Sequence, residues 1–272
     1  MATGLHSDWL IPDWPAPTRV HAVFTSRAGG VSAPPYDSLN LGNHVGDFPE
    51  SVLANRALLQ CALDTRAVFL NQVHGNAVLS LDATTPNGQS ADACITQQRQ
   101  LACTVMVADC LPVLLTTLDG SVVAAAHAGW RGLAGEKSGR GQGVLEEVYA
   151  ALCTFISVDA PVLAWLGPCI GPHAFEVGPE VKAAFEARQP EAAAFFVATG
   201  DGQEGKFLAN LPMLARLRLK ALGVKQIYGN DGSLPWCTVG NPSRFFSHRR
   251  DAGIGGNGFG TTGRMAACIW LD

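Results

Sequence analysis

The sequence predicts a mixed α/β fold in which helices pack against sheets that contain β-hairpins. The chain has 272 residues, of which 47% are hydrophobic, enough to bury a large core. Apolar runs of strand length are mixed with segments of helical period. At Asp119-Gly120 two such runs meet in a tight turn, which a simple doubly wound sheet would not contain. We see no repeat and no linker, so residues 1–272 are predicted to form a single domain.

Strand and helix patterns follow one another along the chain. Residues 19–25 alternate like a strand, and the Gly- and Pro-rich stretch 27–46 after them is expected to be a long loop. From Pro49, the apolar spacing predicts an amphipathic helix. Further helices are expected at 144–155, 179–188 and 208–222, the last ended by Gly223. Further strands are expected at 67–73, 77–81, 101–107, 112–118, 121–127, 162–167, 224–228 and 265–271.

Charge and cysteine usage exclude several classes of protein. Charged residues make up 15% of the chain and the net charge is −4, so no basic surface is available for nucleic acid. The eight cysteines form no CxxC pair and mostly lie among apolar neighbours, as reduced thiols do. No signal peptide and no apolar run near 18 residues is present, so we expect a cytoplasmic protein without a membrane span. The oligomeric state does not follow from the sequence.

The predicted hairpin places a cysteine and a histidine side by side. If Asp119-Gly120 is a two-residue turn, His127 lies opposite Pro112, and Cys110 lies opposite Gly129. Cys110 and His127 then share one face as diagonal neighbours, roughly 7 to 8 Å apart at the backbone. A thiolate and an imidazole in such positions can both bind zinc. A third ligand is expected from His74, which lies between two predicted strands and precedes a glycine.

Two other interpretations of this pair are open. In the first, Cys110 is a thiol of the hydrophobic core, and His127 is a histidine at a strand end whose ring nitrogens are hydrogen-bonded within the protein. Against this, Cys110 follows Asp109 and precedes Pro112, so it lies at a polar start of a strand and not in the core. Alternatively, Cys110 is a nucleophile and His127 its base, because cysteine chemistry needs only a thiolate with a partner in hydrogen-bond reach.

Ten motifs, in order along nearly the whole chain, resemble those of the polyphenol oxidoreductase laccase domain family. They are Ser38–Gly42, His44–Asp47, Gln72–Gly75, Ala91–Ala93, Ala108–Leu115, His127–Leu133, Trp165–Pro168, Phe175–Gly178, Phe245–Asp251 and Thr262–Ala266. Members of this family are described as purine nucleoside phosphorylases, and some bacterial members as peptidoglycan editing factors. The resemblance implies an αββα-layered fold and one zinc ion held by His74, Cys110 and His127. It further implies phosphorolysis of adenosine, inosine and methylthioadenosine, with adenosine deamination as an additional activity.

The implied cofactor is zinc and not copper, since one Cys and two His make a single site. The sequence contains no His-x-His pair with which to build a copper cluster. Three protein ligands leave one coordination position open, as in catalytic zinc sites. The implied partners are small molecules, a nucleoside and phosphate. We treat Cys110 and His127 as catalytic residues as well as ligands.

The remaining site residues are expected from the resemblance and from residue chemistry. Arg56 resembles the family's catalytic arginine, and Arg131 is a candidate for substrate binding, because a guanidinium binds phosphate bidentately. Arg27 and Arg249 are other candidates. Asn40, His44 and Gln72, in polar loop motifs, are suited to ribose or base contacts. Asp109 either orients a ligand or caps a strand end, and His248 is expected to fill a loop position.

The runner-up function is a cysteine hydrolase acting on a cell-wall precursor, with Cys110 as nucleophile and His127 as base. It is consistent with the peptidoglycan-editing role of related bacterial proteins. The chain departs from the family pattern in two glycine-rich segments, 135–143 and 252–260, whose effect on substrate range the sequence leaves open.

Overall fold

The fold was analysed in a computed structural model that describes residues 4–135, 142–156, 160–200, 205–251 and 261–272. Segment 252–260 and most of segment 135–143, including Lys137 and Arg140, lie outside the described residues. Among the helices of the described ranges, none combines the length and the apolar character that crossing a membrane requires.

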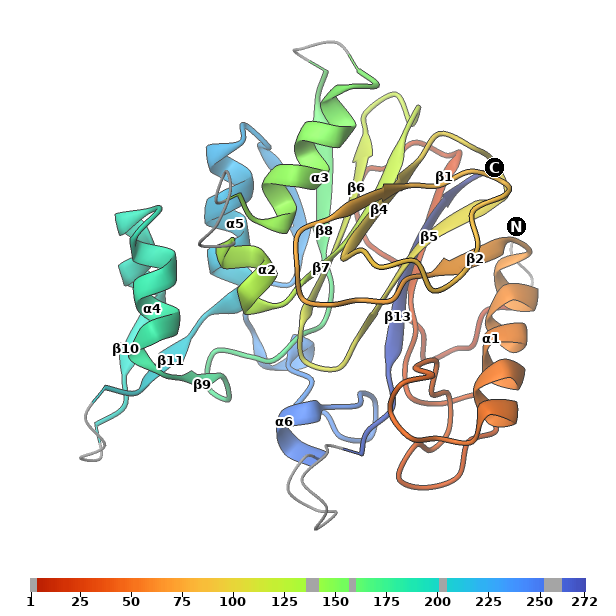
Figure 1. The fold of residues 1–272 in the computed structure, drawn as a ribbon, viewed down its shortest axis with the longest axis horizontal. Coiled ribbons are helices and arrows are strands. Elements are labelled where there is room, and N and C mark those ends of the chain that lie inside the picture. The colour runs from red at the N-terminus through yellow and green to blue at the C-terminus, as the bar shows by residue number, and fades with distance from the viewer. Residues whose placement is uncertain (1–3, 136–141, 157–159, 201–204, 252–260) are drawn as a thin grey trace.

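The first sheet has four strands in the order β1 (Val20–Phe24), β13 (Met265–Leu271), β5 (Leu101–Val107) and β2 (Arg66–Phe69). Strands β1, β13 and β5 are antiparallel neighbours, whereas β2 runs parallel to β5. Helix α1 (Pro49–Leu63) covers its outer face (Figure 1). The helix begins with a proline at its first position, where no backbone N–H is needed.

The second sheet has six strands in the order β12 (Gln226–Gly229), β8 (Val162–Leu166), β6 (Leu111–Thr117), β7 (Val123–Ala128), β4 (Ala93–Thr96) and β3 (Val78–Ser80). Helices α3 (Val144–Cys153) and α5 (Leu211–Ala221) lie on its outer face. The register of the predicted hairpin is confirmed, because His127 of β7 lies opposite Pro112 of β6.

A small peripheral unit extends from the helical side of the second sheet. It consists of β9 (Glu176–Val177), β10 (Phe196–Ala198), β11 (Phe207–Ala209), helix α4 (Pro179–Glu186) and the 3-10 helix Pro190–Phe195. Three further short elements follow strand ends or loops: α2 (Trp130–Ala134), the 3-10 helix Leu234–Trp236 and α6 (His248–Asp251).

Three hydrophobic clusters separate the layers. One lies between α1 and the first sheet, one between the two sheets, and one between the second sheet and its helices. Strand β5 shows the alternation that this requires: Cys103 and Val105 face the second sheet, whereas Ala102 and Met106 face α1. The mixed α/β fold class and the αββα layering are therefore confirmed.

The boundaries differ from the sequence prediction at several elements. The helix expected from residue 208 begins at Leu211, because the side chain of Asn210 caps it by accepting from Met213 N. Residues 207–209 instead form strand β11. The second hairpin strand begins at Val123 rather than at 121, and β2 ends at Phe69 rather than at 73. Strands β4, β9 and β10 and helices α2 and α6 were not predicted, since two to five residues give little periodicity.

The buried amide of Asn55 links the long loop 27–46 to helix α1 at several points. Asn55 accepts a hydrogen bond from Val31 N at 2.8 Å and donates to the carbonyls of Asn40 and Ser38 and to the hydroxyl of Ser32, at 2.8, 3.2 and 2.9 Å. A loop of this length has few packing contacts of its own, so its course depends on such bonds. Asn55 thus helps to fix the course of the loop that leads to His44.

We expect Asn55→Ala to lower the free energy of unfolding by about 2 to 4 kcal/mol, because buried loop groups lose their partners. Leu53→Ala, at a 68% exposed position of the same helix, is the matched control and is expected to change stability by less than about 0.5 kcal/mol. Urea unfolding followed by circular dichroism measures both. Equal effects of the two substitutions would contradict this account of the loop.

Candidate metal centre and active-site cavity

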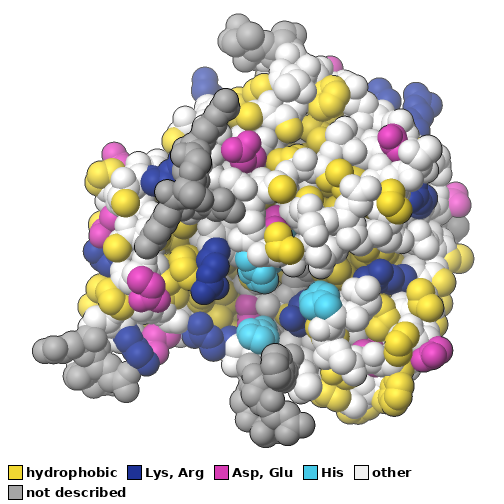
Figure 2. Space-filling view, in the orientation of Figure 1, with side chains coloured by type: hydrophobic (Ala, Val, Ile, Leu, Met, Phe, Trp, Pro, Cys, Tyr) yellow, Lys and Arg dark blue, Asp and Glu magenta, His cyan; other side chains and the backbone are white. Residues whose placement is uncertain are grey.

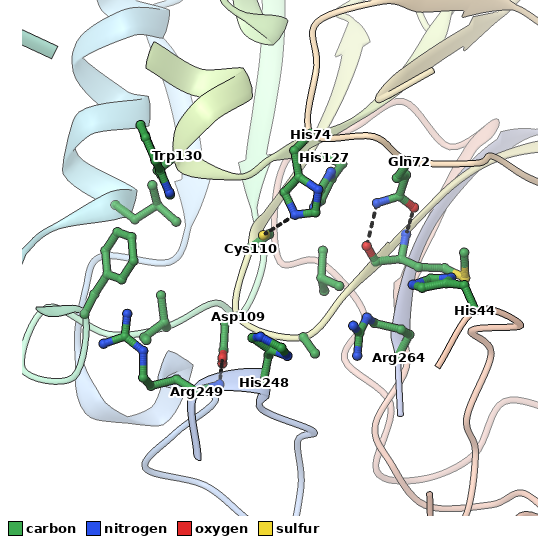
Figure 3. A pocket seen from close by; sticks show the side chains of 16 residues that line it. His44, Gln72, His74, Asp109, Cys110, His127, Trp130, His248, Arg249 and Arg264 are labelled. Carbon is green, nitrogen blue, oxygen red and sulfur yellow. Dashed lines mark hydrogen bonds between the residues drawn. The ribbon is translucent and has the colours of Figure 1, made fainter. Parts of the chain in front are cut away.

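The structure brings His74, Cys110 and His127 together. Their ligand atoms all lie within 4.8 Å of one another, and Cys110 Sγ is 3.8 Å from His74 Nε2 (Figure 3). The two imidazoles meet edge to face, with ring centroids 4.8 Å apart. One thiol and two imidazole nitrogens at these separations are suited to hold a metal ion.

Three separate segments carry the cluster. His74 follows β2 of the first sheet, Cys110 lies between β5 and β6 where the chain passes from one sheet to the other, and His127 belongs to β7 of the second sheet. His74 and Asp109, which precedes Cys110, have φ values of 60° and 88°. Non-glycine residues rarely adopt this left-handed region outside tight turns and functional sites. The backbone is thus held in uncommon conformations on both sides of the cluster.

A buried carboxylate supports two of the three side chains. Asp92 accepts hydrogen bonds from the backbone N–H groups of Val73, His74 and Gly75, at 3.2, 2.9 and 2.7 Å. It also lies 2.8 Å from His127 Nδ1. Burial opposes the ionisation of Asp92, but these hydrogen bonds outweigh it and lower its pKa. Because Nδ1 of His127 faces Asp92, its Nε2 is the atom left for the cluster.

The thiol and the imidazole of the cluster change each other's protonation. Burial disfavours the thiolate of Cys110, but His127 and His74 overcome this effect and lower its pKa to about 6. Burial likewise disfavours the charged form of His127, yet Cys110 and Asp92 raise its pKa to about 9. Without a metal ion, the pair is therefore a thiolate beside an imidazolium at neutral pH.

A cavity of about 260 Å³ opens over the cluster and has two different ends. At one end the lining residues Trp130, Ile170, Phe175 and Leu211 belong to the hydrophobic cluster between the second sheet and its helices. The guanidinium of Arg249 lies at the border of this end, 5.8 Å from the Phe175 ring centroid. The other end carries His44, His248 and Arg264, and Figure 3 shows the cluster between Trp130 on one side and His44 and Arg264 on the other. In the space-filling view (Figure 2), histidine side chains gather around a hollow on this face, with cationic side chains nearby.

Two of the predicted substrate-binding residues, His44 and Gln72, line the cavity. Gln72 donates to the carbonyl of Met106 and accepts from its N–H, both at 2.7 Å, so its amide joins the loop after β2 to strand β5. Asn40 is fully buried, bonds Gly42 within the long loop and accepts from Arg264 N. Asn40 is not among the described residues that line the cavity.

Arg56 and Arg131 also lie outside the described cavity lining. Arg56 donates from Nε to the carbonyl of Leu41 at 2.9 Å and stacks on Phe69, with its guanidinium carbon 4.1 Å from the ring centroid. Burial lowers its pKa to about 10. The guanidinium of Arg131 lies over the Trp130 ring at 4.4 Å. The catalytic role of Arg56 and the substrate-binding role of Arg131 therefore stay predictions.

The other two candidate arginines are engaged with protein groups. Arg27 pairs with Asp37 at 3.1 Å, away from the cavity. Arg249 lines the cavity, but its guanidinium donates to the carbonyls of Ala174 and Glu176 at 3.4 and 3.0 Å. Asp109 accepts from the Thr238 hydroxyl and from Arg249 N, at 2.5 and 2.6 Å, so it anchors α6 beside Cys110.

Sequence reasoning missed several residues of the site. It gave no role to Asp92 or Trp130, it expected His248 only to fill a loop position, and it left Arg264 out of the predicted site. The structure places His248, Trp130 and Arg264 in the cavity wall. A signal existed for Asp92, because it is the charged residue of the Ala91–Ala93 motif, and a carboxylate between two alanines needs polar partners if the segment is buried.

Known proteins resemble this chain over almost its full length. A protein of Escherichia coli K12 named purine nucleoside phosphorylase YfiH is 47% identical over 267 residues, covering 97% of this chain and 99% of its own. A Pseudomonas aeruginosa protein named purine nucleoside phosphorylase PA4543 is 46% identical, with coverage of 97% and 98%.

Solved structures agree with the fold. Neisseria meningitidis protein NMB0706 is 45% identical and superposes with a TM-score of 0.85, covering 98% of this chain and 100% of that one. The protein YlmD from Geobacillus stearothermophilus is 30% identical with a TM-score of 0.80, covering 93% and 92%. Residues 21–272 match the family described as multi-copper polyphenol oxidoreductase laccase, and the chain therefore belongs to that family.

Proposed function

We propose that this chain is a purine nucleoside phosphorylase that transfers the ribosyl group of a nucleoside to orthophosphate. The main support is a cavity in which the His-Cys-His cluster lies between an end lined largely by hydrophobic residues and an end that carries Arg264. Two relatives that cover 97% of this chain are named purine nucleoside phosphorylases. The apolar end beside Trp130 and Phe175 suits a flat purine ring, and the polar end suits ribose and phosphate.

We propose zinc as the metal, with one ion held by His74, Cys110 and His127. One sulfur and two imidazole nitrogens are a ligand set that zinc accepts and that leaves a coordination position open. The family description names several coppers, but the described residues assemble only this one group of three ligands. When bound, zinc supplies a Lewis acid at the floor of the cavity.

The protein's own groups prepare the site for the ion. Asp92 fixes the tautomer and the orientation of His127, and its bonds to residues 73–75 hold His74 in its left-handed conformation. Gly129 leaves room beside both ligands, since a Cβ there would lie 3.0 Å from the His74 ring and 3.1 Å from Cys110 Sγ. The site is thus shaped before any ligand enters.

The reaction forms one bond and breaks another at ribose C1′. A phosphate oxygen bonds to C1′ while the C1′–N9 bond breaks. The electron pair of the broken bond remains on the purine, which then takes a proton. The products are the free purine and ribose 1-phosphate. The protein contributes by placing the two substrates together and by stabilising charge as it develops. We propose that Asn40 and Arg56 act indirectly, since both fix the loop that carries His44.

We also propose adenosine deamination and methylthioadenosine phosphorolysis at the same cavity. In deamination, water adds to C6 of the purine ring of adenosine and ammonia leaves, which gives inosine. Methylthioadenosine differs from adenosine in its 5′ substituent, so the same apolar end receives its purine. Both activities are supported by the resemblance and by the cavity over the His-Cys-His cluster.

A cysteine hydrolase remains the second candidate. The observation that favours it is the Cys110–His127 pair, in which the thiol pKa is lowered to about 6 and the imidazole pKa is raised to about 9. Such a pair is an activated nucleophile with its acid partner. In this case the protein would act without metal and would be inactivated by alkylation of Cys110.

Metal content and purine release are expected to depend on the same residues. We expect about one zinc per chain and release of adenine or hypoxanthine from nucleosides that depends on orthophosphate. Cys110→Ala is expected to lose both the metal and the purine release, because it removes the sulfur ligand. Cys153→Ala, at an exposed free thiol, is the matched control and should retain both. Elemental analysis measures the zinc content, and a purine-release assay measures the activity. A Cys110→Ala protein that lost zinc yet kept its activities would rule out a shared metal-dependent site.

The charge of Asp92 is expected to strengthen metal binding. Asp92→Asn keeps the size of the side chain but removes its charge, so we expect metal affinity to fall by about 10- to 100-fold. Competition with a chromophoric chelator measures the affinity. Asp82→Asn, at an exposed carboxylate, should leave it unchanged. An Asp92→Asn protein with wild-type metal affinity would show that the carboxylate does not orient the ligands.

The reactivity of Cys110 is expected to depend on pH. In protein freed of metal by a chelator, the Cys110 thiolate is present above a pKa of about 6 and is lost as the pH falls through that value. The rate of iodoacetamide reaction at Cys110, followed by peptide mass spectrometry, should therefore have its midpoint near pH 6. His127→Gln removes the stabilising imidazolium and is expected to move the midpoint upward. A wild-type midpoint near 9, the value of an ordinary thiol, would contradict the proposed ion pair.

A further inference from the structure

Arg264 lies at the polar end of the cavity and is held there from several directions. Its backbone N–H donates to Asn40 Oδ1 at 2.9 Å, and its Nη1 donates to the carbonyls of Thr262 and Gly263 at 2.9 and 3.2 Å. Its aliphatic stem lies against Gly42, where a Cβ would be 2.7 Å from Arg264 Cγ. One edge of the guanidinium is thus used by the protein, and the side chain lines the cavity.

The positive charge of Arg264 lacks a carboxylate partner among the described residues. The nearby Asp109 uses one oxygen for the Thr238 hydroxyl and the other for Arg249 N, and Figure 3 shows its carboxylate directed at that backbone group. Burial lowers the pKa of Arg264, which reflects the cost of holding this charge away from water. A largely buried cation without a counter-ion favours the entry of an anion.

Two imidazoles complete this end of the cavity. His44 and His248 both line it, and burial together with the charge of Arg264 lowers the pKa of each. Near neutral pH both are therefore uncharged, and each offers one N–H donor. A planar guanidinium and two single donors from other directions match an anion with oxygens on several sides.

We propose that Arg264, together with His44 and His248, forms the binding site for the orthophosphate that attacks the nucleoside. This inference rests on the proposed function, and it assigns the phosphate to Arg264 rather than to Arg27, Arg56, Arg131 or Arg249. Arg249 is the other cation of the described cavity wall, but both of its Nη atoms donate to carbonyls, those of Ala174 and Glu176. Arg264 uses only Nη1 in this way, which leaves Nη2 and Nε for a ligand.

The arrangement of the cavity fits the geometry of the reaction. The attacking phosphate oxygen must approach C1′ from the side opposite the departing purine, so phosphate and purine belong at opposite ends. The end beside Trp130 and Phe175 receives the purine, and the Arg264 end lies on the other side of the His-Cys-His cluster. The new bond joins the phosphate oxygen to C1′, and the electron pair of the broken C1′–N9 bond leaves with the purine.

The test is Arg264→Gln in the full-length protein with its metal. We expect the KM for orthophosphate to rise by about 10- to 100-fold, as loss of a charge-assisted hydrogen bond predicts, while the KM for inosine changes by less than about threefold. Arg264→Lys keeps the charge but not the planar fork, so an intermediate KM is expected. If circular dichroism shows that the Arg264→Gln protein does not fold, the KM for orthophosphate of the Arg264→Lys protein is the test instead. Arg99→Gln, an exposed charge distant from the cavity, is the matched control with an unchanged KM.

Two results would overturn the assignment while leaving the proposed function intact. In the first, purine release depends on phosphate, but the KM for orthophosphate is the same in Arg264→Gln and in the wild type. In the second, the KM for orthophosphate rises more in Arg249→Gln than in Arg264→Gln. If the wild type releases no purine, calorimetric titration with inorganic phosphate decides. Phosphate binding that is lost in Arg264→Gln supports the anion site without the phosphorylase activity. Absent or equal binding overturns the site.

Discussion

The candidate site depends on one buried carboxylate. Asp92 receives three consecutive backbone N–H groups from residues 73–75 and the Nδ1 of His127, so one side chain fixes a loop of the first sheet and a ligand of the second. A charge in this position is tolerated only because all these donors point at it. Its own carbonyl also accepts from His127 N at 2.7 Å. Cys110 is held separately, through the hairpin and through Asp109.

The fold explains why the cavity has two unlike ends. The apolar end is formed where α2, the start of α5 and the loop before β9 meet over the second sheet, which are parts of the helical layer. The polar end is formed by the long loop after β1 and by the segment before β13, which belong to the first sheet. Each end of the cavity is therefore formed by a different layer of the fold, and the His-Cys-His cluster lies where these layers meet.

The sequence predicted the features that depend on neighbouring residues. The Asp119-Gly120 turn and the alternation of two strands were enough to place Cys110 beside His127, and that register is confirmed. Contacts between distant segments were not accessible in the same way. Asp92 lies 35 positions from His127, and Arg264 joins Asn40 across 224 positions. Polar residues of loop motifs were expected to face a substrate, but Asn40 satisfies its bonds within the protein because a long loop needs internal support.

The position of the cluster has a consequence for folding. Its three ligands come from the first sheet, from the connection between the sheets and from the second sheet, so the ligand set is complete only after the two layers have packed. An ion bound there acts as a cross-link between the layers. By mass action, it stabilises the packed state over every state in which the sheets have separated.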